Sequence, residues 1–244
     1  MFEQTMADLK HANTPKSTVY RRKSGSDPMP ALPSLAQPYN TTIEVVNEDC
    51  MDSCHWFREN YGEEAKIALL NMCSEFCPGG GVVKGSNAQE EAICRQTSLY
   101  PSLKQIQMQG GYPLSPLTVI YTENVKIFKD CAGKRCKRCI VDVFSMAALR
   151  RPRLQNGGYQ PEDYQLMMHK CDTLLHSMAL KGATHLVLGA WGCGAFCNPP
   201  DKVAEIFKHL LETSYKGRFQ FVAFAIYEDK GSYLNDSFTK VFKG

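Results

Sequence analysis

Residues 69–100 read LLNMCSEFCPGGGVVKGSNAQEEAICRQTSLY, and the rest of the chain is interpreted outward from this stretch. An apolar run predicts a buried strand over residues 66–72. It leads into a loop with three adjacent residues that carry no side chain: Gly79, Gly80 and Gly81. After a seven-residue spacer, a predicted helix opens on an amide and two acids: Gln89, Glu90 and Glu91. A bare backbone admits a sugar or phosphate closely, and a carboxylate beside a ligand can act as a general acid or base, so the stretch indicates glycosidic chemistry.

Length and composition favour one substantial domain. The chain has 244 residues, 43% of them hydrophobic, and a formal net charge of only +3. So mild a charge does not predict direct recognition of nucleic acid. Neither a signal-like apolar segment at the N-terminus nor an apolar run long enough to span a membrane is present. Eleven cysteines in such a chain favour reduced thiols, and we expect an intracellular protein, cytoplasmic or nuclear.

Residues 1–40 differ in composition from the remainder. A short polar helix is predicted from Glu3 to His11, and four prolines lie between Pro28 and Pro38. The basic triplet at 21–23 has two interpretations, a localisation signal or a solvated part of a tail. We therefore predict a polar, proline-rich tail over residues 1–40 and a catalytic domain over residues 41–244.

Strands and helices alternate through the predicted domain. The expected strands cover 42–46, 66–72, 117–121 with 125–128 (a hairpin or one bulged strand), 140–144, 184–188 and an alternating 219–227. The expected helices cover 52–61, 89–99, a long segment from Pro161 and a segment from Pro199 to about Leu211. This order predicts a three-layer α/β/α fold.

Asp49 follows the strand predicted at residues 42–46. The ends of strands are where open α/β sheets bind ligands, so a ligand contact is one interpretation. The other is that Asp49 or Asp52 caps the next helix.

A second glycine-rich loop reads GAWGCGAFCN over residues 189–198. It joins the strand at 184–188 to a helix with Asn198 as its expected cap and Pro199 at its first position. Backbone N–H groups at such a helix start form an anion site suited to a diphosphate. The glycine spacing matches neither the dinucleotide fingerprint nor the P-loop. The candidate ligand contacts in this loop are Gly192, Cys193, Gly194, Ala195 and Phe196.

Three cysteines in the basic segment DCAGKRCKRC raise the question of a metal: Cys131, Cys136 and Cys139. Thiolates are natural zinc ligands, but no second paired cluster follows at zinc-finger spacing. An exposed basic loop is the simpler interpretation, and we expect no metal site. His185, within a predicted strand, is interpreted as a core histidine.

The two loops together resemble those of a known family. The GGG, seven-residue spacer and QEE, continued by CRQTSLYP, are similar to the signature of the poly(ADP-ribose) glycohydrolases, and the GAWGCG loop looks like the microbial-type branch. The resemblance covers roughly residues 40 to 230. It departs from the branch at Cys77, where asparagine is common, and at Cys197, where glycine is common.

The resemblance implies a macrodomain-like fold with a mixed central sheet and an activity that needs no cofactor. The implied reaction is hydrolysis of the ribose–ribose O-glycosidic bond of poly(ADP-ribose), which releases ADP-ribose. Glu91 would protonate the leaving oxygen and then activate water, and Glu90 would hold ribose hydroxyls. The other implied substrate contacts are Gly79, Gly80, Gly81, Gln89, the adenine contact Asp49, the diphosphate loop and Phe196 over the ribose.

Two other functions fit the same residues. The protein would be a hydrolase that removes a single ADP-ribose from an acidic or arginine side chain, or a reader that binds ADP-ribose without catalysis. A pure reader has no need of both Glu90 and Glu91, which favours an enzyme. The expected partners are therefore poly(ADP-ribose) or an ADP-ribosylated protein, with ADP-ribose as product and no membrane.

Overall fold

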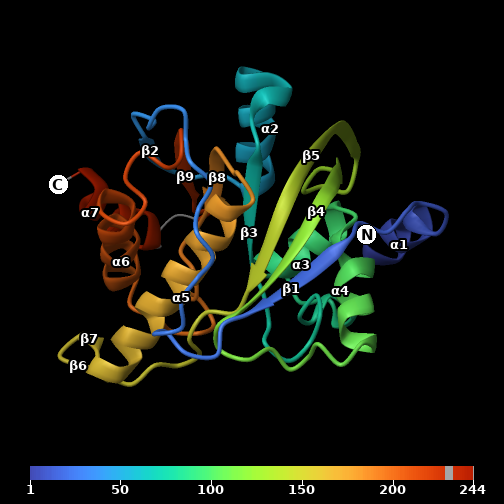
Figure 1. Cartoon of the computed structure of the whole chain (residues 1–244). Coiled ribbons are helices and arrows are strands. Elements are labelled where there is room, and N and C mark those ends of the chain that lie inside the picture. The colour runs from blue at the N-terminus through green and yellow to red at the C-terminus, as the bar shows by residue number, and fades with distance from the viewer. Residues whose placement is uncertain (229–232, 244) are drawn as a thin grey trace. The chain divides into compact units, whose positions relative to one another are not determined.

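The computed structural model describes residues 1–228 and 233–243 (Figure 1). The fold is mixed α/β, and seven strands form one sheet in the order β1-β4-β5-β3-β8-β9-β2. Both antiparallel and parallel pairs occur in it. The α/β class with a mixed sheet, expected from the sequence, is confirmed. The chain divides into two compact units, residues 1–21 with 69–147 and residues 22–68 with 148–244, and each is described by itself below.

The first unit carries the long antiparallel strands (Figure 1). Its elements are α1 (Phe2–Leu9), β1 (Ser17–Arg21), most of β3 (Ile67–Met72), the short 3-10 helix Val82–Lys84, α3 (Gln89–Gln96), α4 (Leu99–Met108), β4 (Thr118–Lys129) and β5 (Arg135–Met146). β4 pairs antiparallel with both β1 and β5. The pairing of β4 with β5 shifts register between Thr122 and Val125, where Asn124 has φ 56°. Of the two alternatives for this segment, the single bulged strand is therefore confirmed.

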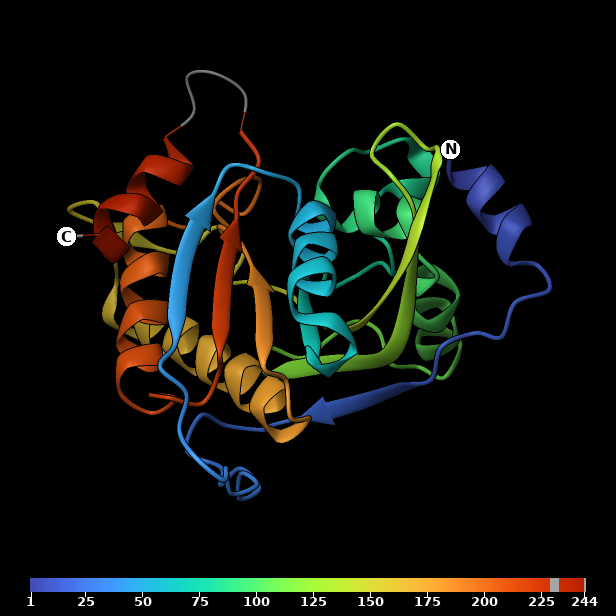
Figure 2. The same cartoon turned by 90° about the horizontal axis from the view of Figure 1, so that it is seen from above.

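The second unit carries the parallel strands, whose arrangement is open to view in Figure 2. Its elements are β2 (Thr42–Val46), α2 (Cys50–Tyr61), the 3-10 helix Gly62–Glu64, β6 (Leu154–Gln155), β7 (Gly158–Tyr159), α5 (Pro161–Leu180), β8 (His185–Leu188), α6 (Pro200–Glu212), β9 (Phe221–Ala225) and α7 (Leu234–Lys243). β9 pairs in parallel with β2 on one side and β8 on the other. α2 lies against β8 and β9, and α7 lies against β2 and α6.

The burial of β9 differs from the prediction. An alternating strand was expected over residues 219–227, but all five residues of Phe221–Ala225 are buried. A strand with a parallel neighbour at each edge is covered on both faces, so its side chains are apolar on both. The expected alternation is wrong for this reason.

The helix expected over residues 89–99 is in fact two helices. Thr97 is extended, with φ −133° and ψ 173°, and separates α3 from α4. Pro101 does not end a helix but lies in the first turn of α4, where the missing N–H would have no partner in any case. The segment of Cys131 to Cys139 also differs from the expected loop, because β5 begins at Arg135 and Cys139 is buried.

Residues 1–40 contain ordered elements. The expected polar helix is present as α1, and β1 adds a strand, Ser17–Arg21, that pairs with β4 from Ser17 to Arg21. β1 was not predicted, since its sequence STVYR is short and stands between prolines and basic residues. The division into a tail over 1–40 and a domain over 41–244 stays a prediction.

Two features are absent from the described part of the chain. No helix there is long and apolar enough to cross a membrane. No group of three or more His, Cys, Asp or Glu side chains in residues 1–228 and 233–243 is arranged to hold a metal ion.

Candidate active site

The glycine loop and the start of α3 bring the two acids together in the first unit. The loop follows β3, and Glu90 and Glu91 lie in the first turn of α3 (Figure 1). Their exposed fractions are only 4% and 7%. Two carboxylates this well buried need hydrogen-bond donors, and the loop supplies them.

Glu90 is held by two backbone amides. Its Oε1 accepts from the N–H of Gly79 at 3.0 Å, and its Oε2 accepts from the N–H of Ser74 at 2.7 Å. Burial raises the pKa of Glu90 to about 8, against the lowering effect of these two N–H groups. Glu90 therefore retains a proton near neutral pH and can donate a hydrogen bond as well as accept one.

Glu91 is held in the same manner from the other side of the loop. Its Oε1 accepts from the N–H of Gly81 at 2.8 Å, and its Oε2 accepts from the N–H of Ala88 at 3.0 Å. The Ala88 contact also satisfies a free N–H at the start of α3. Both acids are thus positioned by rigid backbone and not by mobile side chains.

The loop packs too closely for side chains at Gly79 and Gly80. At Gly80, with φ +57°, an added Cβ would lie 2.4 Å from Glu91 Oε1 and 3.1 Å from Glu90 Oε2. At Gly79, with φ +71°, a Cβ would lie 2.7 Å from the ring of Tyr100. Glycine is required here both for the left-handed backbone and for the close approach of the loop to the carboxylates.

The backbone donors of this loop are already used. The N–H groups of Gly79 and Gly81 donate to the two acids, and that of Gly80 donates to the carbonyl of Cys77 at 3.0 Å. The loop was expected to lie against a sugar or phosphate. In the structure, the N–H groups of Gly79 and Gly81 orient Glu90 and Glu91. A direct contact of Gly79, Gly80 or Gly81 with substrate stays a prediction.

Gln89 ties the start of α3 to β3. Its Oε1 accepts from the N–H of Met72 at 2.8 Å, and its Nε2 donates to the carbonyl of Leu70 at 2.7 Å. The side-chain amide therefore spans two backbone groups of the strand. A substrate contact for Gln89 stays a prediction, while its role in placing the next two residues is visible in these bonds.

Several residues of this unit were not singled out from the sequence. The hydroxyl of Tyr112 is buried, has no hydrogen-bond partner among the described residues, and has its pKa raised by burial and by neighbouring groups that include Glu90. Ser74 supplies an N–H to Glu90. From α1, Thr5 donates to the carbonyl of Arg95 at 2.5 Å, and Phe2 packs edge-on against Tyr100 with ring centroids 4.9 Å apart. Backbone donors and contacts between distant segments leave no pattern in a sequence, so no signal marked these residues.

Asp49, in the second unit, caps α2. Its Oδ1 accepts from the N–H of Met51 at 2.8 Å, and burial raises its pKa. The capping interpretation is confirmed, and the contact with adenine stays a prediction. Asp52, the other residue weighed for this cap, lies inside the helix.

Asn198 fastens the second glycine-rich loop in a way that differs from the prediction. Its Nδ2 donates to the carbonyls of Leu149 at 2.6 Å and Gly192 at 3.0 Å, and its Oδ1 accepts from the hydroxyl of Tyr159 at 2.8 Å. α6 begins at Pro200 with Pro199 as its N-cap. The expected cap at Asn198 is therefore wrong, because its amide is consumed by the loop itself.

The tip of this loop is exposed, whereas its base is buried. Trp191 is fully buried, Cys193 is buried, and Gly194 and Ala195 are exposed. The guanidinium of Arg150 lies 5.8 Å from the ring centroid of Phe196. Cys197 has φ +59°, a conformation that glycine adopts without strain. An exposed tip beside an arginine suits an anion.

His185 is a core histidine, as expected. It is 1% exposed, its ring centroid lies 4.4 Å from that of Tyr61, and its Nδ1 lies 2.9 Å from the hydroxyl of Thr184. Burial lowers its pKa to about 4. It stands within the aromatic packing of α2 on β8 and β9.

The mixed sheet, together with two adjacent acids that accept hydrogen bonds from a glycine loop, defines a macrodomain-like hydrolase suited to glycosidic acid–base chemistry. Residues 4–130 match the family model described as microbial-type poly(ADP-ribose) glycohydrolase, catalytic domain. This range includes the glycine loop and both acids. Comparison with curated protein sequences found no match.

Solved structures agree with the family match. The poly(ADP-ribose) glycohydrolase of Thermomonospora curvata bound to the inhibitor ADP-HPD is 31% identical, with a TM-score of 0.74 over 82% of this chain and 79% of that chain. The Deinococcus radiodurans enzyme in complex with ADP-ribose is 31% identical, with a TM-score of 0.71 over 84% and 85%. A further Thermomonospora curvata structure is 27% identical, with a TM-score of 0.78 over 98% and 89%. The chain therefore belongs to the microbial-type poly(ADP-ribose) glycohydrolases, and it is a glycosidase.

Proposed function

We propose that this chain hydrolyses the ribose–ribose O-glycosidic bond of poly(ADP-ribose) and releases ADP-ribose. The observation that carries the proposal is the pair of buried carboxylates fixed by the N–H groups of Gly79 and Gly81. The related enzymes with ADP-ribose or ADP-HPD bound support the same substrate class.

Glu91 performs both proton transfers in the proposed mechanism. Its carboxylic acid protonates the oxygen of the leaving ribose, the C–O bond breaks, and an oxocarbenium-like ribose forms. The resulting Glu91 carboxylate takes a proton from water, whose oxygen bonds to the anomeric carbon, and the acid is restored. Adjacent residues on one helix cannot flank the bond as the two acids of most glycosidases do, so one acid serves twice.

Glu90 holds ribose hydroxyls. Because it retains a proton near neutral pH, it can offer both a donor and an acceptor to neighbouring hydroxyl groups. The side-chain amide of Gln89 bonds to the backbone of Met72 and Leu70 in β3, and this fixes the start of α3, where both acids lie. In this scheme Glu90 binds and Glu91 reacts.

Three further substrate contacts are proposed for residues of the second unit, each argued from that unit by itself. The loop from Gly192 to Phe196, whose tip at Gly194 and Ala195 is exposed, binds the diphosphate, and its place beside Arg150 supports this. Phe196 covers a ribose, and Asp49 receives the adenine amino group. Support for Asp49 is its position at the end of β2, where its cap to α2 uses Oδ1.

The proposed partner is the polymer, or an ADP-ribosylated protein that carries it. We also propose an intracellular location, cytoplasmic or nuclear. It is supported by seven buried cysteines that the described structure does not join in disulfides: Cys50, Cys54, Cys73, Cys94, Cys139, Cys171 and Cys193.

The test compares two substrates. Purified protein is incubated with poly(ADP-ribose) attached to a protein and, separately, with a protein that carries single ADP-ribose units, and released ADP-ribose is measured by mass spectrometry. Release from the polymer is expected. Release from the mono-modified protein alone would reassign the chain to removal of single units, and binding without release from either would make it a reader.

A further inference from the structure

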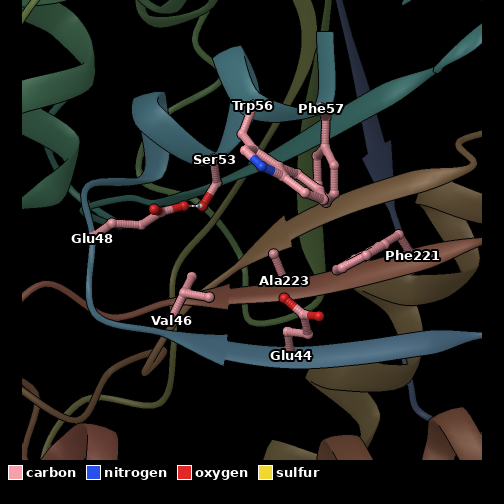
Figure 3. Close-up of a pocket in the computed structure, with 8 residues that line it drawn as sticks. All are labelled: Glu44, Val46, Glu48, Ser53, Trp56, Phe57, Phe221 and Ala223. Atoms are coloured by element: carbon pink, nitrogen blue, oxygen red, sulfur yellow. Dashed lines mark hydrogen bonds between the residues drawn. The ribbon is translucent and has the colours of Figure 1, made fainter. Parts of the chain in front are cut away.

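A pocket on the second unit lies where the middle of α2 passes over β2 and β9 (Figure 3). Val46 and Ala223 form its floor, and Trp56 and Phe221 line one side of it. Glu44 and Glu48 bring carboxylates to its margin. Asp49 is not among the lining residues, and neither is any residue of the loop at 189–198.

The aromatic side of the pocket is fixed before any ligand arrives. The ring of Trp56 packs edge-on against Phe221 with centroids 5.6 Å apart, and it also contacts Phe57 at 5.6 Å and Tyr61 at 6.0 Å. Even so, Trp56 is 45% exposed. An indole that is held by three rings and open to solvent offers a ready face for a cation or a planar group.

No basic residue in the described part of the chain neutralises the acidic side of the pocket. Glu44, Val46 and Glu48 alternate along the chain, and Glu44 lies opposite Ala223 in the pairing of β2 with β9. Glu48 Oε1 accepts from the hydroxyl of Ser53 at 2.5 Å, a neutral partner. Over the described residues, no Lys, Arg or His lies within ion-pair distance of either carboxylate.

We propose that this pocket is a docking site for a basic segment of another protein, and that it takes an arginine side chain. The aliphatic stem would cover Val46 and Ala223, the guanidinium would stack on Trp56, and a carboxylate of Glu44 or Glu48 would receive its N–H groups. The two carboxylates lie apart, so a segment with more than one basic residue fits the pocket better than a single arginine (Figure 3).

The negative charge of Glu44 and Glu48 makes this pocket unsuited to a nucleotide. Two carboxylates at the margin repel a diphosphate, whereas they attract a cationic segment. The pocket also has an apolar floor, which a hydrated metal ion would not use. An arginine-containing polypeptide is the occupant that uses the stem, the ring and both charges, and it does not depend on the hydrolase activity.

The experiment uses the fluorescence of Trp56. The chain has two tryptophans, and Trp191 is fully buried, so a surface ligand acts on the emission of Trp56. The probe is a capped Gly-Arg-Gly-Arg-Gly peptide, and the matched control peptide replaces arginine by citrulline, its neutral isostere. A saturable change with the arginine peptide alone is expected. No saturable change, or equal binding of the citrulline peptide, would overturn the proposal.

Matched variants separate the pocket from general attraction. Glu44→Gln with Glu48→Gln is expected to weaken the arginine peptide at least roughly tenfold, since charge-assisted hydrogen bonds are lost. Glu59→Gln with Glu212→Gln changes the net charge equally at exposed positions outside the pocket and should leave the affinity unchanged. Equal weakening by both pairs would overturn the proposal. A third outcome would also contradict the proposal. In it the protein self-associates, does not bind the peptide, and becomes monomeric only when Glu44→Gln and Glu48→Gln are introduced. The occupant of the pocket would then be a second copy of this chain.

Discussion

Gly80 lies so close to Glu91 and Glu90 that a single added methyl group would collide with the carboxylate of Glu91. An alanine Cβ there would lie 2.4 Å from Glu91 Oε1, closer than any real contact, and the backbone has φ +57°. The carboxylate of Glu91 would have to leave the N–H of Gly81 that now holds it. The position of Glu91 Oε1 therefore depends on the absence of a side chain at Gly80, whose Cα lies two bonds from the N–H donor of Gly81.

We predict that Gly80→Ala lowers kcat at least roughly tenfold while the protein still folds, because a displacement of about 1 Å in a catalytic group costs up to a hundredfold. Gly85→Ala is the matched control, since Gly85 has φ +83° but nothing within 4 Å of its added Cβ. Both variants carry the strain of about 1–2 kcal/mol that a left-handed alanine imposes. Steady-state kinetics and urea unfolding are measured for both. Equal activity of the two variants would show that the contact with Glu91 has no catalytic role.

The chemistry at single positions could be predicted from the sequence, but its geometry could not. Glycines and acids are visible as residue types, so the pairing of GGG with Glu90 and Glu91 could be inferred. That the glycine N–H groups orient the acids depends on how the loop folds back on α3. Asn198 was misassigned as a cap. Asparagine is favoured at helix caps, but its amide can also donate to loop carbonyls, as it does here.

At the scale of elements, α1 supports α3, the helix that carries Glu90 and Glu91, within the first unit. Thr5 donates to the carbonyl of Arg95 near the end of α3 and accepts from Lys129 Nζ at 3.0 Å. Lys129 is 3% exposed and pairs with Asp8 at 2.8 Å. Phe2 of α1 packs on Tyr100, whose ring lies against Gly79. The N-terminal helix is thus linked to both ends of the acid-bearing segment.

We predict that Thr5→Val lowers the free energy of unfolding by about 1–3 kcal/mol, because it removes the hydroxyl that donates to the Arg95 carbonyl and one of the two partners of the buried Lys129 ammonium. The matched control is Thr14→Val at an exposed position of the same N-terminal region. Urea denaturation measures both. If Thr5→Val is no less stable than Thr14→Val, α1 does not stabilise this unit through Thr5.

Most elements could be predicted because their signals are local. The apolar run of β3 and the long amphipathic α5 follow their expected periods. α4 was missed since Pro101 looks like a helix end, although proline fits a first turn. β1 was missed because its stability comes from pairing with β4, more than 90 residues away, which STVYR alone does not reveal.

At the scale of the whole molecule, two buried titratable groups affect stability in opposite directions. Glu90 has its pKa raised from 4.5 to about 8 in the folded protein, so the folded state binds the extra proton and stability falls as pH rises through that range. His185 has its pKa lowered from 6.5 to about 4, so stability falls as pH drops from 6.5 toward 4. The two effects oppose each other between 4.5 and 6.5, and only that of Glu90 acts above 6.5.

We predict that the free energy of unfolding decreases on the order of 1–2 kcal/mol between pH 6.5 and 8 and that Glu90→Gln flattens this slope, since one linked proton contributes about 1.4 kcal/mol per pH unit. Urea denaturation across the range is the measurement. His185→Gln is the control, because it should change the slope only below pH 6.5. An unchanged slope in Glu90→Gln would contradict a proton on Glu90 in the folded state.

The fold class could be predicted at this scale because strands and helices alternate along the chain. The two glycine-rich loops supplied the family, and the family match over residues 4–130 bears it out. It reaches further toward the N-terminus than the resemblance seen in the sequence, which began near residue 40, and it takes in most of α1 and all of β1. The contribution of those first elements became visible only in their contacts with β4 and α3.

The most direct measurement of the central claim separates binding from turnover in Glu91→Gln. Calorimetry gives the Kd for ADP-ribose, and quenched-flow assays give kcat on poly(ADP-ribose), for this variant and the unaltered protein. We predict an affinity within a few-fold of the original and a loss in kcat of at least roughly a hundredfold, the scale of acid–base catalysis. Retention of most of the turnover would contradict the assignment of Glu91 as the acid that cleaves the glycosidic bond.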